Sequence, residues 1–455
     1  MPEVDLTIDE LNAGGDGIGR LGGRQVLVPF TIPGERVRVR IPGGPRRDAR
    51  QGPDLATLLE VLQPSPHRVS ARCRHFGPGA SPGVGPCGGC SWQHIAYPEQ
   101  LRLKTALLDR IVRAAVPRAP RVRAMEAATP IDQPWGYRHK VHFVFGTQAD
   151  RPVMGHYVRG SRRIVPVEEC PVHHELGNDL AFRLRARLIR RQERHRSHND
   201  MALRGVAIRI AHRSAEAMAT IVVRHTLDKR LRGATREAIA QDPRTSYHLN
   251  VHPGDDRFIF GRDTRTLSGP ERMREQVHGA SFLVSPTAFF QTNVAAAERL
   301  VALVLAAVPP QARVLDLYAG AGLFAIPLAL AGHSVTAIEE NRAAVADGDA
   351  SLRLNRVDAA RCRFIARRVE AAIAAVAAAD VVVLDPPREG CTPGVIDAVF
   401  GRLRPALAIY VSCNPEALGA DLRQIAALGY RVHSIQPVDM FPHTAHIEAV
   451  VVLTR

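Results

Sequence analysis

A cysteine and a glutamate near the end of the chain have the types and settings that covalent chemistry needs. Cys413 comes directly after a predicted buried strand over residues 408–412, and Glu448 lies near a predicted closing strand. A thiolate can form a transient adduct with an electron-poor carbon, and a carboxylate can then remove a proton. We predict covalent group transfer onto a nucleobase, with Cys413 as the nucleophile and Glu448 as the base.

Both assignments have alternatives in the sequence. A cysteine at a strand end is often a small core residue, but the position of Cys413 between Ser412 and Asn414 favours the catalytic role. His443 and His446 lie in the same segment as Glu448 and are rival bases, because imidazole is a common general base.

A glycine-rich turn predicts a cofactor site. Residues 313–317 read as a strand that runs into a turn containing Gly320 and Gly322. The turn lacks the third glycine and the helix-start lysine of phosphate-binding loops, so it favours S-adenosylmethionine over NAD or ATP. Glu339 follows about twenty residues later, where a carboxylate can accept hydrogen bonds from ribose hydroxyls.

Four chemically capable side chains stand at or near the ends of predicted strands: Asp316, Glu339, Asp385 and Cys413. Open α/β sheets bind ligands at the carboxyl ends of their strands, so all four can face one crevice. Asp385 is an acceptor suited to the N3 hydrogen of uracil, whereas cytosine has an acceptor at that position. The alternative role for Asp385 is to cap a helix.

Four further cysteines form a candidate metal site: Cys73, Cys87, Cys90 and Cys170. Four thiolates can hold zinc or a four-iron cluster, and spacing alone does not choose between them. The remaining two, Cys362 and Cys391, fit no site and are predicted to be structural.

The strand and helix patterns predict three parts. Residues 1–65 alternate apolar and polar positions between glycine-rich turns, which is typical of a small β-barrel. Residues 66–285 mix strands with helices, including one near residues 97–115 and one with Leu180, Leu184 and Leu188 on a single face. Residues 286–455 alternate strands and helices and predict a doubly wound, mainly parallel Rossmann-like sheet.

The charge of the chain favours a nucleic-acid partner. It has 455 residues, with 60 Lys and Arg against 45 Asp and Glu, a net charge of +15 and a pI near 10.2. A basic loop at residues 43–52 and the arginines of residues 183–196 could contact RNA or simply face solvent.

The compartment follows from the cysteines and from the start of the chain. There is neither a secretory signal nor an apolar run long enough to span a bilayer, and seven cysteines form no disulfide framework. We expect a cytoplasmic protein with no membrane association and no obligate protein partner.

Taken together, the motifs resemble the RNA uracil-C5 methyltransferase family, especially its members with an N-terminal TRAM barrel, an iron-sulfur cluster and 23S rRNA as substrate. The resemblance rests on these stretches: Cys87-Gly88-Gly89-Cys90, Gly136-Tyr137-Arg138, Phe289-Phe290-Gln291-Thr292-Asn293, Asp385-Pro386-Pro387-Arg388-Glu389-Gly390, Ser412-Cys413-Asn414-Pro415 and Phe441 to Glu448.

The resemblance implies a mechanism and a set of partners. Cys413 would attack carbon 6 of uracil, and Glu448 would remove the carbon-5 proton after methyl transfer from S-adenosylmethionine. It favours a [4Fe-4S] cluster over zinc on the four cysteines, with Cys73 the least secure ligand because residues 77–86 are a long insertion. A tRNA enzyme is the alternative, and a non-catalytic RNA-binding protein is disfavoured because all the reactive groups are present.

The cofactor pocket implied by the resemblance has these residues: Gln291, Tyr318, Gly320, Glu339 and Asp385. Two positions depart from the family pattern, since Leu323 replaces a polar residue and Arg368 stands where an adenine contact is expected.

Overall fold

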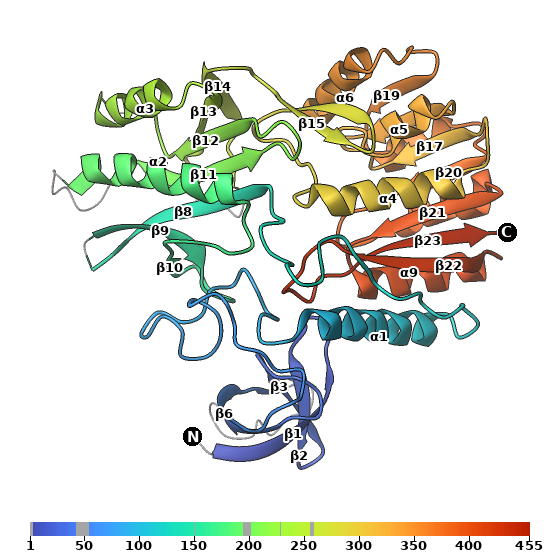
Figure 1. Cartoon of the computed structure of the whole chain (residues 1–455). Coiled ribbons are helices and arrows are strands. Elements are labelled where there is room, and N and C mark those ends of the chain that lie inside the picture. The colour runs from blue at the N-terminus through green and yellow to red at the C-terminus, as the bar shows by residue number, and fades with distance from the viewer. Residues whose placement is uncertain (1–2, 42–53, 150, 194–201, 228, 255–258) are drawn as a thin grey trace.

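The computed structural model describes residues 3–41, 54–149, 151–193, 202–227, 229–254 and 259–455 (Figure 1). The predicted basic loop at residues 43–52 and the arginines beyond residue 193 lie outside these ranges. Within the described part, no helix is both long and apolar enough to cross a membrane.

The N-terminal strands form a curled six-stranded sheet in the order β5-β3-β2-β1-β4-β6. Their bounds are β1 Glu3–Leu11, β2 Gly17–Leu21, β3 Arg24–Val28, β4 Arg36–Arg40, β5 Asp54–Leu55 and β6 Thr57–Gln63. Ala56 alone separates β5 from β6, although these strands lie at opposite edges of the sheet, so the sheet must curl on itself. Alternate residues such as Val37 and Val39 fill its interior. The predicted small barrel is confirmed.

The middle of the chain builds a seven-stranded sheet in the order β10-β9-β8-β11-β12-β13-β14, in which only the β12 and β13 pair is parallel. Its strands are β8 Lys140–Gln148, β9 Arg151–Tyr157, β10 Ile164–Pro166, β11 Leu203–Ile210, β12 Ala217–Val223, β13 Thr245–Val251 and β14 Asp263–Ser268. The hairpin of β15 Met273–Val277 and β16 Ala280–Val284 follows.

Helices α2 (Glu175–Glu193) and α3 (Lys229–Gln241) accompany this sheet (Figure 1). The predicted apolar face of α2 is confirmed, since Leu180, Leu184 and Leu188 are all buried in the sheet's core. Beside this face, Arg183 donates to Asp242 at 3.0 Å and Arg187 donates to Gln241. These two arginines therefore join α2 to the end of α3.

The C-terminal sheet is eight-stranded, in the order β19-β18-β17-β20-β21-β23-β22-β7. Its strands are β17 Arg313–Leu317, β18 Ser334–Glu339, β19 Cys362–Ala366, β20 Val381–Leu384, β21 Leu407–Ser412, β22 Arg431–Asp439, β23 Glu448–Thr454 and β7 Glu126–Ala127. The five strands from β19 to β21 are parallel, and β23 is antiparallel to both its neighbours. The predicted doubly wound sheet is confirmed.

Helices cover both faces of this sheet. One face packs against α4 Val294–Ala307, α5 Ala325–Leu330 and α6 Arg342–Leu354. The other packs against α1 Tyr97–Ala115, α7 Val369–Ala372, α8 Pro393–Ile396 and α9 Pro415–Ala427, with a π-helical segment at Asp397–Leu403. Successive strand residues alternate between the two cores, as in Val382 and Val383.

Two elements from the middle of the sequence belong spatially to the C-terminal sheet. Helix α1 lies along α9, and β7 adds a short strand beside the end of β22 (Figure 1). The three-part division at residues 1–65, 66–285 and 286–455 stays a prediction, but the last part shares its core with α1.

Candidate active site

The order of the parallel strands reverses between β17 and β20, and a crevice opens at the carboxyl ends of strands at such a point. Asp316 and Tyr318 lie at the end of β17, and Glu339 closes β18. Asp385 follows β20 directly, and Cys413 follows β21. The structure thus places these predicted residues at one edge of the sheet.

Cys413 occupies a tight turn between β21 and α9. The Ser412 hydroxyl accepts the Asn414 backbone N–H at 3.2 Å, and the Asn414 side chain caps α9 by accepting the Glu416 N–H at 3.1 Å. The dipole of the 13-residue helix α9 favours a negative charge at this end. Burial, with the nearby Glu448 and Asp385 charges, nevertheless raises the pKa of Cys413 to about 11.

Glu448 is brought to Cys413 by strand pairing. In the antiparallel β21 and β23 pair, Ser412 lies opposite Ala449, so Cys413 and Glu448 occupy the adjoining strand ends. Burial, and then the Asp385 charge, raises the pKa of Glu448 to about 8. Burial raises the pKa of Asp385 to about 7. The Asp385 charge therefore acts on Glu448, and both carboxylates act on the Cys413 thiol.

The loop after Asp385 is fastened to the cysteine turn. The Asn414 side-chain amide donates to the Arg388 carbonyl at 2.8 Å. Thr392, not Asp385, is the residue that precedes the next helix, α8. Asp385 therefore has no capping role there, and its carboxylate remains available to a ligand.

The glycine turn has the backbone that a cofactor site needs. Tyr318 and Gly320 have φ of 62° and 55°, in the left-handed region. The Glu339 carboxylate accepts the backbone N–H of Gly320 at 2.9 Å and that of Asn341 at 2.7 Å, which fixes its position. Asp316 is fully buried, and both its oxygens lack a hydrogen-bond partner in the described structure.

The two positions that depart from the family pattern have other surroundings. Leu323 is buried in the core beneath the glycine turn. Arg368 is exposed and lies 3.7 Å from both Glu340 and Glu370.

Gln291 lies in the segment that joins β16 to α4, and both neighbouring domains hold this segment. Lys140 and Arg209, two buried cations of the middle sheet, donate to the Ala288 carbonyl at 2.9 and 3.0 Å. Asn293 caps α4 and also donates to the Met440 carbonyl at 3.0 Å. Gln291 is therefore carried between the middle sheet and the loop that leads to Glu448.

Both ring nitrogens of His443, a rival base in the sequence, make structural contacts. Its Nδ1 lies 3.2 Å from the Gln100 amide nitrogen and its Nε2 lies 3.0 Å from the Pro134 carbonyl oxygen. The ring stacks on Trp135 at 3.8 Å. Burial lowers the pKa of His443 to about 4. With both nitrogens occupied, this imidazole has no free position for an incoming proton. His446 is exposed.

Sequence reasoning missed the residues that hold the segment 440–447 between β22 and β23. We call this segment the base-bearing loop because it leads directly to Glu448, the predicted base. Gln100 of α1 accepts the His443 N–H at 2.8 Å, and the His443 carbonyl accepts the N–H groups of Ser91 and Trp92 at 3.0 and 2.9 Å. Lys104 of α1 donates to Asp439 at 2.6 Å, and both side chains are fully buried. The sequence offered one signal for these contacts: Gln100 and Lys104 lie one helical turn apart in the amphipathic helix α1.

The N-terminal barrel also contacts this loop. Gly15 has φ of +83°, and a Cβ there would meet Ala445 at 2.4 Å. The Trp92 indole donates to the Gly15 carbonyl at 2.8 Å. Leu11 and Ile32 of the barrel share a small core with Trp92 and Ala445. The barrel is thus part of the support around the active site.

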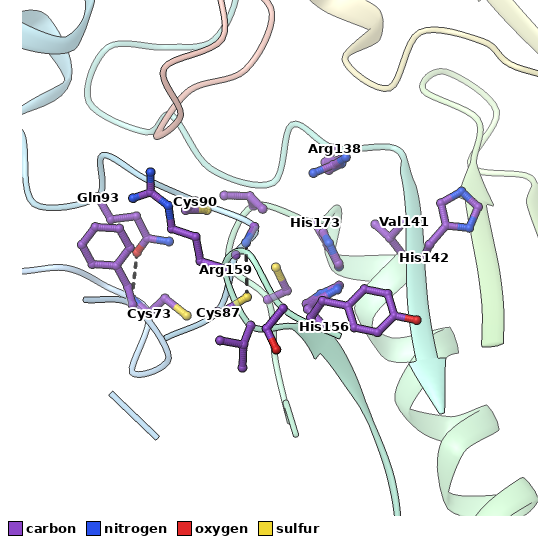
Figure 2. Close-up of a pocket in the computed structure, with 18 of the residues that line it drawn as sticks. Cys73, Cys87, Cys90, Gln93, Arg138, Val141, His142, His156, Arg159 and His173 are labelled. Atoms are coloured by element: carbon purple, nitrogen blue, oxygen red, sulfur yellow. Dashed lines mark hydrogen bonds between the residues drawn. The ribbon is translucent and has the colours of Figure 1, made fainter. Parts of the chain in front are cut away.

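The four predicted metal-binding cysteines line one cavity of about 730 Å³ (Figure 2). The loop that carries Cys73, Cys87 and Cys90 pairs with the end of β9, where Gly88 N–H donates to Tyr157 at 2.9 Å. Burial raises the thiol pKa of Cys90 to about 12 and raises that of Cys170 as well. Residues about a hundred positions apart therefore meet in one thiol-rich pocket.

The C-terminal sheet has five parallel strands in the order β19-β18-β17-β20-β21, and the antiparallel strand β23 lies between β21 and β22. This arrangement is an S-adenosylmethionine-dependent methyltransferase fold. Residues 136–455 match the family described as tRNA (uracil-5-)-methyltransferase. Residues 4–67 match the TRAM domain of tRNA (uracil(54)-C(5))-methyltransferase.

Relatives extend the match over the whole chain. An uncharacterized RNA methyltransferase of Gloeobacter violaceus is 36% identical over 99% of this chain and 96% of its own. One of Thermosynechococcus vestitus is 35% identical over 99% and 98%. The solved Pyrococcus abyssi tRNA (uracil-54, C5)-methyltransferase, in complex with S-adenosyl-L-homocysteine, superposes with a TM-score of 0.75 at 26% identity, covering 99% and 100%. The chain belongs to the RNA uracil-5-methyltransferase family and is an RNA methyltransferase.

Proposed function

We propose that this protein methylates carbon 5 of a uridine in RNA through a covalent adduct on Cys413. The observation that carries the proposal is the register of β21 and β23, which brings Cys413 and Glu448 to adjoining strand ends beside Asp385. A nucleophile, a buried base and an acceptor for the uracil edge are the three groups that the reaction needs.

The steps follow from uracil chemistry. The Cys413 thiolate adds to carbon 6, and the displaced electron pair makes carbon 5 nucleophilic. S-adenosylmethionine, when bound, supplies the methyl group that carbon 5 takes. Glu448 then removes the carbon-5 proton, the ring double bond re-forms, and the carbon–sulfur bond breaks to release the Cys413 thiolate. Asp385 accepts the N3 hydrogen throughout and selects uracil over cytosine.

The residues of the glycine turn fit this cofactor. The unpartnered Asp316 carboxylate suits a positively charged ligand, because a buried anion without a partner is costly. A Cβ added at Gly320 would meet no atom within 4 Å, so the turn leaves room beside the fixed carboxylate of Glu339. With Gln291, Tyr318 and Asp385, these residues would line the cofactor pocket.

The cysteine cavity fits a [4Fe-4S] cluster better than a four-cysteine zinc site. In such a zinc site the sulfur atoms lie roughly 3.8 Å apart. Among the described residues, the ligand atoms grouped within 4.8 Å are those of His156, Cys170 and His173, and not the four sulfurs. Arg138 and Arg159 line the cavity and would offset the charge of four thiolates. A cluster there would fasten the loop of Cys87 to Cys170.

Separate observations favour each of two candidate substrates, 23S rRNA and tRNA. The cysteine cluster, through the resemblance, favours 23S rRNA. The names of both matching families and of the Pyrococcus abyssi enzyme favour tRNA. In either, the uridine must leave its helix or loop to reach the half-buried Cys413.

Mapping 5-methyluridine in total RNA from cells with and without the gene tests this function. We expect loss of the modified base at a single uridine, restored by the wild-type gene but not by the Cys413→Ala gene. The RNA that loses it identifies the substrate. Unchanged 5-methyluridine in both tRNA and 23S rRNA would contradict the proposal.

Gln100 should act as a positioning residue for Glu448. In Gln100→Ala, the His443 N–H loses its acceptor, so we expect the base-bearing loop to shift. Proton removal should slow by about 10- to 100-fold, less than the roughly 10²–10⁴-fold that loss of a general base typically costs. The measurement is turnover on natural RNA together with the amount of covalent RNA–protein adduct, which should rise.

The control uses RNA with 5-fluorouridine, where carbon 5 has no proton to lose and the adduct persists. Gln100→Ala should form this adduct at the wild-type rate, since attack and methyl transfer precede the base. Gln100→Glu keeps an acceptor for His443 and should recover part of the turnover. A Gln100→Ala protein that loses both reactions equally would show a general structural role instead.

A further inference from the structure

Two histidines on the wall of the cysteine cavity, one half-buried and one buried, are not used by the proposed reaction. His156 lies in β9, and His173 lies just before α2. Their rings meet edge to face at 5.3 Å, and Figure 2 shows both against the same cavity. His173 is 4% exposed. His156 Nε2 and His173 Nδ1 are buried without a hydrogen-bond partner among the described residues.

Unpartnered nitrogens of this kind are costly. A buried polar atom without a partner costs roughly 1–3 kcal/mol, so two of them side by side indicate a ligand for imidazole nitrogen. Imidazole binds metals through the lone pair of a ring nitrogen, and an unpartnered buried nitrogen leaves that lone pair available.

Cys170 completes the group. Its sulfur and one ring nitrogen from each histidine all lie within 4.8 Å of one another. The His173 N–H donates to the Cys170 carbonyl at 3.0 Å, so a tight turn holds these two residues together. Around tetrahedral zinc, such atoms are about 3.3–3.8 Å apart, so small side-chain rotations close the site.

We infer that His156, Cys170 and His173 form a mononuclear zinc site, which the chain fills when the four-cysteine set is empty. Imidazole nitrogen and thiolate are the ligands that zinc prefers, and three of them leave a fourth position for water. Because Cys170 belongs to both ligand sets, zinc here and a four-iron cluster exclude each other. The pocket therefore has two alternative metal states.

The test uses the full-length protein after iron has been removed by a chelator under reducing conditions. Zinc titration should give about one bound ion per chain, and X-ray absorption at the zinc edge should show two imidazole nitrogens and one sulfur. The chain with Cys73→Ser and Cys87→Ser should still bind zinc, because neither cysteine belongs to this site.

In that doubly substituted background, His156→Phe should weaken zinc binding by at least about 100-fold, since even outer-shell changes cost 10–100-fold. His142→Phe is the matched control, because His142 lines the same cavity but lies outside the group. It should leave zinc binding unchanged. In the otherwise wild-type chain, His156→Phe should keep its iron.

Two results would overturn the inference. One is a zinc ion coordinated by three or four sulfurs in the iron-free wild-type protein. This measurement does not depend on the folding of any variant. The other is loss of zinc from the Cys73→Ser and Cys87→Ser chain when its circular dichroism matches that of the wild type. Neither measurement depends on RNA or on methyl transfer, so the proposed function stands or falls separately.

Discussion

Cys413→Ala is expected to abolish methyl transfer and to prevent any covalent complex with 5-fluorouridine RNA. Without the thiolate, carbon 5 of uracil is not activated, and no other described side chain at this strand end is a comparable nucleophile. Both readouts should fall to background: methyl incorporation from labelled S-adenosylmethionine, and the slow-migrating RNA–protein band on a denaturing gel.

The matched control is Cys362→Ala, which removes another buried thiol from β19. It should keep both reactions, although it loses a small amount of stability through the cavity left behind. A Cys413→Ala protein that still forms the 5-fluorouridine adduct would eliminate Cys413 as the nucleophile, whatever its turnover.

Glu448→Gln is expected to stop the reaction one step later. Attack by Cys413 and methyl transfer do not need the base, so the protein should accumulate a covalent complex with natural uridine RNA. Loss of a positioned general base typically costs 10²–10⁴-fold in rate, and turnover should fall within that range. The amount of adduct after one turnover, followed over time, measures the effect.

His446→Gln is the control for this prediction, because His446 is the remaining rival and is exposed, while His443 has both nitrogens occupied. It should release product normally. If Glu448→Gln turns over like the wild type and His446→Gln accumulates adduct, the base is the histidine.

The assignment of Glu448 as the base predicts how the rate of adduct release depends on pH. Glu448 acts as a carboxylate, and burial together with Asp385 raises its pKa to about 8. Release of a preformed adduct should therefore rise about tenfold per pH unit below 8 and level off above it. A midpoint near pH 4 would mean that the base is not in this buried setting.

Some features of the fold were readable because they depend on local sequence. Residues 313–317 form a strand with the predicted bounds, since short apolar runs bounded by turns have few other solutions. Helix α1 has the predicted extent for a similar reason, because its apolar residues recur at helical spacing. The strand β19, however, was not predicted, since it has only five residues and Arg363 interrupts its apolar run.

The chemical types at the site were also readable from the sequence. A cysteine between a strand and a proline-started helix, and acidic residues at strand ends, carry their chemistry in their identity and position along the chain. The roles of Cys413, Glu448 and Asp385 could therefore be proposed, although the sequence left His443 and His446 as rivals to Glu448.

Only the tertiary structure distinguishes His443 from Glu448 as a candidate base. Occupation of both His443 nitrogens depends on Gln100 and Pro134, each more than 300 positions away, and no local pattern encodes contacts at that separation. The same holds for the pairing of β21 with β23, for the barrel's contact with Ala445, and for the histidines beside Cys170. The sequence by itself determined which groups could react and which segments fold locally. The packing of α1, the barrel and the middle sheet around the base-bearing loop decided which group is free to act, because burial and hydrogen-bond partners arise only when distant segments meet.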